Sequence, residues 1–296
     1  MSLEIMPIPD LPSQIIEAAE NKNLAIFVGA GLSRFMGCSS WGALADNLLN
    51  KCETRGLLNN YEKTVLSQSN DFKKTITICH HLLEEEDFLE EMRKSLNDDK
   101  VGDENIDIYK NLFSLNGLII TTNADRHIDQ VYLSDNIVIE NFTSSTPVDN
   151  DHLYKIHGSI TDLNSLIFTV EGYLKRYTDS EYGKFLEEIF TKYTVLFLGY
   201  GMSEFGLMDY LFTSIRGTRK RHYFLKDYFT HEQRIYEFDQ MYFDDLGVDL
   251  IPYAKDELGF NQLPIIIDQW VQEIKSKTLV LSTNYDDIDD ALGNPL

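Results

Sequence analysis

Cysteine is scarce in this sequence, and its spacing excludes two kinds of protein. The chain of 296 residues has three cysteines, Cys38, Cys52 and Cys79, and none of them forms a C-x-x-C pair. Three ligands scattered in this way make a poor zinc site. The small, odd number also argues against a disulfide framework, so we expect a protein of the reducing cytoplasm.

Basic residues and long apolar runs are scarce as well. The chain has 26 lysines and arginines against 48 acidic residues, a formal net charge of −22. Such a chain repels nucleic-acid backbones. No run approaches the ~18 apolar residues that span a bilayer, and the N-terminus lacks a signal-peptide pattern. We therefore expect no membrane and no direct nucleic-acid binding, and we interpret the one basic cluster as a solvated loop: Arg216, Arg219, Lys220 and Arg221.

Short apolar runs alternate with helical patterns along the chain, of which 43% is hydrophobic. Runs such as Leu24–Val28 are typical of parallel strands buried on both faces. The alternation predicts an α/β fold with a Rossmann-like, doubly wound parallel sheet. The predicted strands are 24–28, 118–122, 137–139, 153–156, 194–198, 222–225 and 248–251, and the predicted helices include 11–22, 41–52, 181–192, 231–245 and 262–277.

Residues 57–98 interrupt this alternation, because they look helical almost throughout. They stand between the first predicted strand and the second, which predicts a helical subdomain inserted into the α/β core. We take the insert as about 53–110, within one domain that covers 1–280. Residues 281–296 hold Asn, Asp, Gly and Pro among few apolar residues and predict a tail or a linker.

The first predicted strand ends in Gly29-Ala30-Gly31, followed by Ser33. Glycines allow backbone conformations barred to other residues and leave room for an anion beside amide N–H groups. The third glycine of the dinucleotide fingerprint is missing, since Arg34 takes its place. A purely structural turn therefore stays an equal alternative at this point, and Ser33 suits either a phosphate or a helix cap.

Three further strands end in polar or glycine residues, and ligands of open α/β sheets bind beyond such carboxyl ends. Asn123 and Asp125 follow the second strand, His157 follows the fourth, and glycines follow the fifth. Imidazole suits proton transfer near neutral pH, and an amide can hold a water or a ribose hydroxyl. A turn role for Asn123, a cap for Asp125 and a buried, satisfied His157 are the structural alternatives. Converging loops would outline a dinucleotide cleft.

Pairs of histidines and carboxylates suggest metal sites, and we reject them. His80 and His81 are adjacent, so on a helix their side chains point about 100° apart. His127 and Asp129 lack a third ligand with matched spacing. We therefore expect no metal, and we interpret the acidic run 84–87 as a solvated helix face.

The order of these motifs resembles that of the sirtuin family of NAD-dependent enzymes. The matching elements cover most of the chain from Leu24 to Tyr253, and they are Gly29-Ala30-Gly31-Leu32-Ser33, Thr122-Asn123-Ala124-Asp125, Lys155-Ile156-His157-Gly158-Ser159 and Gly199-Tyr200-Gly201-Met202-Ser203. The resemblance implies that NAD phosphates bind at Gly29, Ala30, Gly31 and Ser33. It implies that Asn123 and Asp125 face the nicotinamide and its ribose, that His157 is catalytic, and that the adenosine side meets Gly199, Gly201, Ser203, Asp227 and Tyr253.

Two departures narrow the resemblance. Protein deacylases of the family carry two C-x-x-C pairs for a structural zinc, and this chain has none. Their Pro-x-Phe-Arg element is replaced by Gly37-Cys38-Ser39-Ser40-Trp41, in which Trp41 would pack the next helix or stack near nicotinamide. The chain is thus similar to the sirtuin-like NAD-hydrolase domains of bacterial anti-phage defence proteins of the Thoeris effector type.

That resemblance implies an NAD⁺ hydrolase, which releases nicotinamide and ADP-ribose and depletes NAD in abortive infection. NAD would be the substrate and Asn123 and His157 the catalytic residues. We also expect a homo-oligomer and a sensing or regulatory domain or partner protein. Two alternatives remain: a catalytically silent module that senses NAD or ADP-ribose, and an NAD-dependent protein deacylase.

Overall fold

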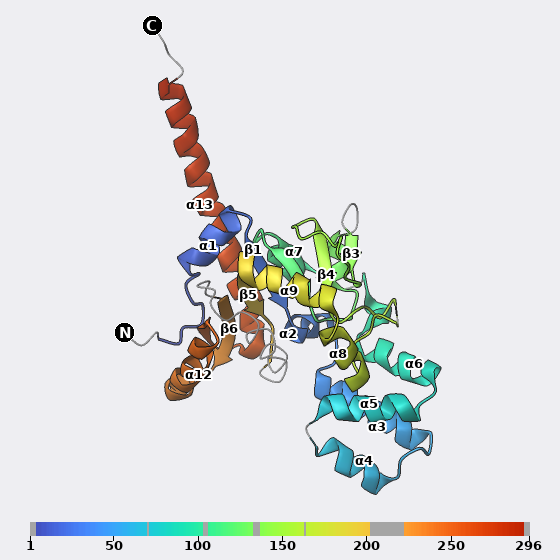
Figure 1. Ribbon diagram of the computed structural model, residues 1–296. Helices are drawn as coiled ribbons and strands as arrows, with labels where there is room; N and C mark the ends of the chain where they lie inside the picture. The colour runs from blue at the N-terminus through green and yellow to red at the C-terminus, as the bar shows by residue number, and fades with distance from the viewer. Residues whose placement is uncertain are drawn as a thin grey trace.

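The computed structural model describes residues 4–69, 71–102, 106–132, 137–162, 164–201 and 222–292. Its centre is a seven-stranded sheet in which all neighbouring strands are parallel, in the order β3-β4-β2-β1-β5-β6-β7 (Figure 1). The predicted fold class is therefore confirmed. The strands are β1 (Leu24–Val28), β2 (Leu118–Thr121), β3 (Ile137–Ile139), β4 (His152–Lys155), β5 (Thr194–Leu198), β6 (His222–Tyr228) and β7 (Val248–Ala254).

Alternation along the central strands builds a separate hydrophobic core on each face of the sheet. Ile26 and Val28 of β1 belong to one core, and Ala25 and Phe27 belong to the other. The first core is covered by α1 (Ser13–Glu20), α7 (Asp107–Phe113) and α13 (Gln262–Leu292), and the second by α9 (Ser180–Lys192) and α12 (Gln233–Asp245). This two-sided covering explains why the central strands are apolar without interruption.

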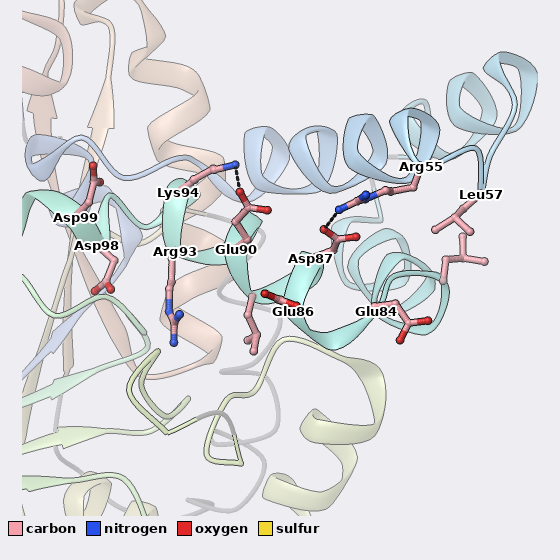
Figure 2. Close-up of a pocket in the computed structure, with 12 residues that line it drawn as sticks. Arg55, Leu57, Glu84, Glu86, Asp87, Glu90, Arg93, Lys94, Asp98 and Asp99 are labelled. Carbon is pink, nitrogen blue, oxygen red and sulfur yellow. Dashed lines mark hydrogen bonds and ion pairs between the residues drawn. The ribbon is translucent and has the colours of Figure 1, made fainter.

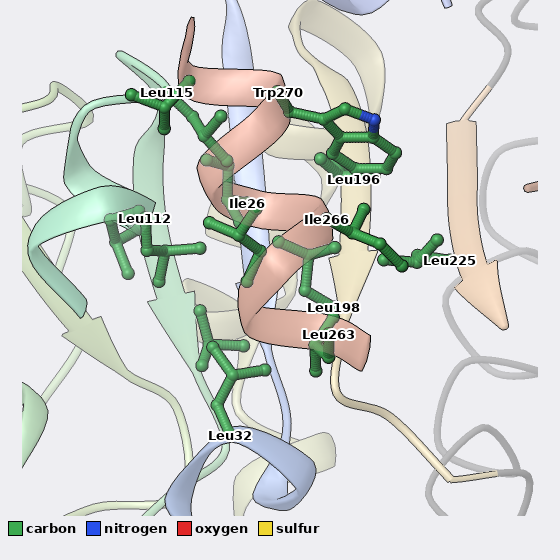
Figure 3. Close-up of a cluster of buried hydrophobic side chains, with 14 of the residues drawn as sticks. Ile26, Leu32, Leu112, Leu115, Leu196, Leu198, Leu225, Leu263, Ile266 and Trp270 are labelled. Carbon is green, nitrogen blue, oxygen red and sulfur yellow. The ribbon is translucent and has the colours of Figure 1, made fainter. Parts of the chain in front are cut away.

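Helix α13 contributes several buried side chains to the first core. Its Leu263, Ile266 and Trp270 lie over Ile26 and Leu196 of the sheet (Figure 3). The Trp270 indole N–H donates to the Pro9 carbonyl at 2.9 Å, so the buried ring leaves no polar group unsatisfied.

The helix α13 continues to Leu292, beyond residue 277, where the sequence pattern had predicted its end. In Figure 1 it projects from the body of the molecule towards the C-terminus. The domain boundaries, 1–280 for the domain and 281–296 for a tail or linker, stay predictions.

A helical lobe with its own core lies beside the sheet (Figure 1). Its helices are α3 (Trp41–Thr54), α4 (Asn60–Ser67), α5 (Phe72–Leu82) and α6 (Glu85–Ser95). The lobe thus includes α3, most of which precedes the predicted insert of about 53–110. The starts of α3, α4 and α5 are fixed by side chains that accept backbone N–H groups: Ser40 caps α3, Asn59 forms a capping box with Glu62 at α4, and Asp71 caps α5.

Short elements join these parts. They are α2 (Ala30–Ser33), α8 (Val170–Tyr177) and the 3₁₀ turns η1 (Arg34–Met36), η2 (Asp98–Lys100), η3 (Ile128–Tyr132), η4 (Thr230–Glu232) and η5 (Gly259–Asn261). No zinc-binding module occurs in the described part of the chain. Among the helices that the structure describes, none is both long and apolar enough to cross a bilayer.

Candidate functional site

The strand order reverses at β1, and two glycine loops touch there. β1 pairs with β2 on one side and with β5 on the other. The Gly31 N–H donates to the Gly199 carbonyl at 2.8 Å. A Cβ on Gly31 would lie 2.6 Å from that carbonyl oxygen, and one on Gly199, which has φ +70°, would lie 2.3 Å from a Leu32 methyl. Only glycine at both positions allows this approach.

The glycine amides hold the loops together in this conformation. The Gly29 N–H donates to the Leu198 carbonyl at 2.9 Å, and the Gly31 N–H is used by Gly199. The same edge of the sheet is the crevice where doubly wound folds bind nucleotides.

A buried polar network joins the ends of β1 and β2. The Asn123 amide donates to the Gly29 carbonyl at 3.0 Å and to the Ser33 hydroxyl at 2.8 Å. The Ser33 hydroxyl donates to the Asp125 carboxylate at 2.6 Å and lies 3.3 Å from the Tyr109 hydroxyl. Ser33 makes no side-chain cap, and the second carboxylate oxygen of Asp125 accepts the His127 N–H at 3.1 Å. The predicted residues are thus brought together.

A small pocket opens onto this network. Its volume is about 40 Å³, and its lining includes Ala30, Ser33, Asn123 and Asp125. Ligand pockets usually measure roughly 300–1,000 Å³, so this one is far too small for a dinucleotide. Trp41 packs on Phe168 with ring centroids 5.1 Å apart, and both rings line the pocket. Trp41 therefore packs against Phe168 at the pocket, and its stacking near nicotinamide stays a prediction.

His157 lies next to this network at the end of β4. Thr121 of β2 pairs with Lys155 of β4, and Asn123 and His157 each follow two residues later. Asn123 and His157 therefore leave the same edge of the sheet from adjacent strands, which are about 4.8 Å apart. Their side chains bond to different elements, since Asn123 bonds to Gly29 and Ser33 whereas His157 bonds to Tyr177, and His157 is not among the residues that line the pocket. Gly158 makes the turn with φ +74°, where a Cβ would lie 2.0 Å from the Ser165 carbonyl oxygen.

The imidazole of His157 is covered by α8. It is 3% exposed, its Nε2 lies 3.0 Å from the Tyr177 hydroxyl, and its ring meets the Tyr173 ring edge-on. Among the described residues, none provides a hydrogen-bond partner for the buried Nδ1 atom. Burial, helped by the charges of Arg176 and Lys73, lowers the pKa of His157 to about 3, so the ring is neutral at pH 7.

A buried lysine orders the loop after β2, and our sequence analysis missed it. Lys155 is fully buried, and its ammonium donates to Asp129 at 2.9 Å and to the Asp125 carbonyl at 2.6 Å. The signal was a lysine inside an apolar strand, directly before His157. Such a charge needs a partner of opposite charge, which the half-buried Asp129 supplies.

Other predicted residues lie apart from this network or outside the described residues. Asp227 is on β6, ion-paired with Lys255 at 2.6 Å, and Tyr253 stands opposite it on β7. These strands are two and three places from β1 in the sheet. Gly201 follows β5 and is exposed. Outside the described residues lie Ser203 and the basic cluster Arg216, Arg219, Lys220 and Arg221.

A larger hollow, of about 1,040 Å³, lies on the insert along α6 (Figure 2). Arg55 pairs there with Asp87, and Lys94 pairs with Glu90 at 2.7 Å. Most of its charged side chains are acidic, which disfavours a diphosphate. We therefore place the candidate site at the small pocket. The lining of the hollow is Arg55, Leu57, Leu82, Glu84, Glu86, Asp87, Leu89, Glu90, Arg93, Lys94, Asp98 and Asp99.

Comparison with known proteins agrees with this geometry. Residues 117–251 match the family model described as SIR2-like domain. The NAD(+) hydrolase ThsA of Enterococcus faecium is 30% identical over 203 residues, which is 64% of this chain. The chain spans only 39% of the length of that relative.

Proposed function

Because the chain carries a SIR2-like domain, we propose that it is an NAD⁺ hydrolase that cleaves the bond between nicotinamide and ribose. The observation that supports this most is the buried network of Asn123, Ser33 and Asp125 beside His157, where the strand order reverses. The similarity to an NAD(+) hydrolase supports this reaction class.

The proposed cofactor-binding residues follow the edge of the sheet. The diphosphate would bind at the turn of Gly29, Ala30, Gly31 and Ser33, and Asp125 would face the nicotinamide ribose. The adenosine side would meet the residues predicted after β5, β6 and β7, which are Gly199, Gly201, Ser203, Asp227 and Tyr253.

The reaction needs the protein to position the substrate and the attacking water and to supply one general base. The C–N bond breaks with its electron pair going to nicotinamide, which leaves as a neutral molecule, and the ribose develops oxocarbenium character as in glycoside hydrolysis. Asn123 would position the water or the ribose hydroxyl. His157 would accept the proton from the attacking water. Since Tyr177 engages Nε2, the nitrogen left for this proton is Nδ1.

The site must open before it can act. The pocket of about 40 Å³ cannot admit NAD, and a histidine whose burial lowers its pKa to about 3 is a weak base. The insert contacts the helix that covers His157, because the Val170 N–H of α8 donates to the Thr77 hydroxyl of α5 at 3.0 Å, and Lys73 lies over the Tyr173 ring. We therefore infer that the insert keeps the site closed until a trigger releases α8.

The biological role follows from the resemblance. We propose a cytoplasmic defence effector that depletes NAD during phage infection, acts as a homo-oligomer and is controlled by a sensing domain or partner protein. Closure of the site suits such a role, since unregulated NAD loss would harm the host cell.

One assay tests the reaction. The purified protein is incubated with NAD⁺ in ¹⁸O-labelled water, alone and with candidate activators, and the products are separated by chromatography. The proposal predicts equal amounts of nicotinamide and ADP-ribose, with one ¹⁸O atom in each ADP-ribose.

The buried, weakly basic His157 favours one alternative, a module that senses NAD or ADP-ribose without turnover. In the same assay that alternative predicts nucleotide binding and no nicotinamide under any condition. Release that depends on an acyl-lysine peptide would instead indicate a deacylase.

A further inference from the structure

A thiol, a carboxylate and an imidazole meet behind the wall of the small pocket. The ligand atoms of Cys38, Asp125 and His127 all lie within 4.8 Å of one another. The three residues are 7%, 1% and 0% exposed. Cys38 and Asp125 also line the pocket, so the cluster adjoins the proposed NAD site.

A fourth donor atom belongs to the same cluster. The Leu96 carbonyl oxygen lies 3.1 Å from the Cys38 sulfur and 3.1 Å from Nε2 of His127. Sulfur, imidazole nitrogen and carboxylate oxygen are the donors that zinc takes, usually four in a tetrahedron. With metal–ligand distances of 2.0–2.3 Å, neighbouring donors would be roughly 3.5 Å apart, so small side-chain movements would suffice.

The charge at Asp125 is a second, independent indication of a cation. Its carboxylate accepts hydrogen bonds from the Ser33 hydroxyl and the His127 N–H, which are both neutral donors. In the part of the chain that the structure describes, no lysine, arginine or histidine side chain forms an ion pair with this carboxylate. The Lys155 ammonium nearby pairs with Asp129. Buried carboxylates are normally paired with a cation or bound to a metal.

We propose that Cys38, Asp125 and His127, with the Leu96 carbonyl, bind one Zn²⁺ ion, and that this ion inhibits NAD hydrolysis. On binding, the Cys38 thiol releases its proton to solvent and its sulfur bonds to zinc. The inhibitory part rests on the proposed function, because zinc would take the Asp125 carboxylate away from the nicotinamide ribose. The site itself does not depend on that function.

Cobalt(II) gives a direct readout of such a site, because a thiolate bound to Co²⁺ produces a strong ligand-to-metal charge-transfer absorption band. Co²⁺ is titrated into the full chain in the absence of NAD. The proposal predicts one equivalent bound with this band, and bleaching of the band when Zn²⁺ displaces Co²⁺. Absence of the band in the wild-type chain overturns the site.

Matched variants assign the ligands. Cys38→Ser keeps a hydroxyl that can donate to Leu96, and should lose the band and weaken Zn²⁺ binding by at least about tenfold. His127→Gln should weaken binding similarly. Cys52→Ser changes a buried thiol in the insert and should keep the band. Thermal denaturation shows that each variant is folded. A band that survives in Cys38→Ser, or that disappears in Cys52→Ser alone, contradicts the assignment.

Nicotinamide release then tests inhibition separately. Equimolar Zn²⁺ should suppress release by the wild type, EDTA should restore it, and Cys38→Ser should stay active in Zn²⁺. Zinc that binds with the expected cobalt signature yet leaves wild-type release unchanged overturns the inhibitory role. If the chain never releases nicotinamide, the proposed function is wrong. The cobalt spectrum still tests the metal site in that case.

Discussion

The loops after β2 and β4 leave the sheet side by side, but they satisfy their polar groups differently. At the end of β2, Asn123 and Asp125 are bonded to the chain on several sides, through Ser33 and the Gly29 carbonyl. At the end of β4, the described residues give His157 one hydrogen-bond partner, Tyr177, and give none to its buried Nδ1. The first loop is preorganised, whereas the second has an unused nitrogen that a substrate can engage.

The largest effect should come from removing that nitrogen. His157→Ala should lower nicotinamide release by about 10²–10⁴-fold, the usual contribution of a general base, with less effect on NAD binding. Asn123→Ala should lose turnover as well, through loss of positioning. Release is measured by chromatography and binding by calorimetry. A His157→Ala protein that releases nicotinamide at the wild-type rate would refute the assigned role.

The loops after β1 and β5 approach closely at Gly31 and Gly199, and Gly199→Ala should disrupt this contact. A Cβ at φ +70° and 2.3 Å from a Leu32 atom should reduce the free energy of unfolding by about 2–4 kcal/mol. Gly183→Ala in α9 is the control, because a Cβ there meets nothing within 4 Å and alanine favours the helix. Denaturant unfolding of both variants checks this, and equal stabilities would contradict it.

The burial of neutral His157 should make the free energy of unfolding fall at acidic pH. Its pKa is about 3 in the folded chain and 6.5 in the unfolded chain, so the unfolded state binds a proton first as the pH falls. The contribution of the neutral ring to the free energy of unfolding is complete above pH 6.5 and is lost progressively as the pH falls towards 3. At pH 5 the loss is about 2 kcal/mol. Unfolding free energies from pH 8 to 5 should therefore fall less steeply in His157→Gln. Parallel curves would show that the folded pKa is not lowered.

Tyr177→Phe sharpens the comparison by freeing Nε2 while keeping the ring. We expect a drop in kcat of about tenfold with a changed pH profile and little change in KM, since one hydrogen bond to His157 is lost. Tyr193→Phe removes a hydroxyl that bonds to Val148 and should have no effect. Equal activity of the two variants would show that the Tyr177 hydroxyl does not assist His157.

The smallest expected effect concerns the link between the insert and α8. Thr77→Val removes the acceptor of the Val170 N–H and should raise basal nicotinamide release a few-fold. Thr64→Val is matched to it, since that hydroxyl donates to Asn60 within α4. An unchanged basal rate in Thr77→Val would count against closure through this contact.

Local pattern predicted the sheet well. Strands such as Leu24–Val28 and Thr194–Leu198 were predicted residue for residue, because continuous apolar runs are needed for burial on both faces. The helix α8 was missed although Val170, Tyr173, Leu174 and Tyr177 follow a helical spacing, because it has only eight residues and so gives a weak signal in the sequence. The end of α13 was missed because weak helix formers after residue 280 resemble a tail.

The site was predictable in part. The residues Asn123, Asp125 and His157 could be found because they follow strands directly, and parallel strand ends share one edge. The partner of His157 and the cysteine near His127 could not be found, since both contacts join segments far apart in the chain. Long-range pairings of this kind depend on how the loops pack and have no local signature.

The proposed function requires that the ends of β1, β2, β4 and β5 form one NAD⁺ site. A crystal structure of His157→Ala soaked with NAD⁺ tests it most directly, since that variant should bind without turnover. We expect the diphosphate at the Gly29–Ser33 turn and the nicotinamide ribose within hydrogen-bond distance of Asn123 and Asp125. A nucleotide bound elsewhere, for example in the hollow along α6, would contradict the account.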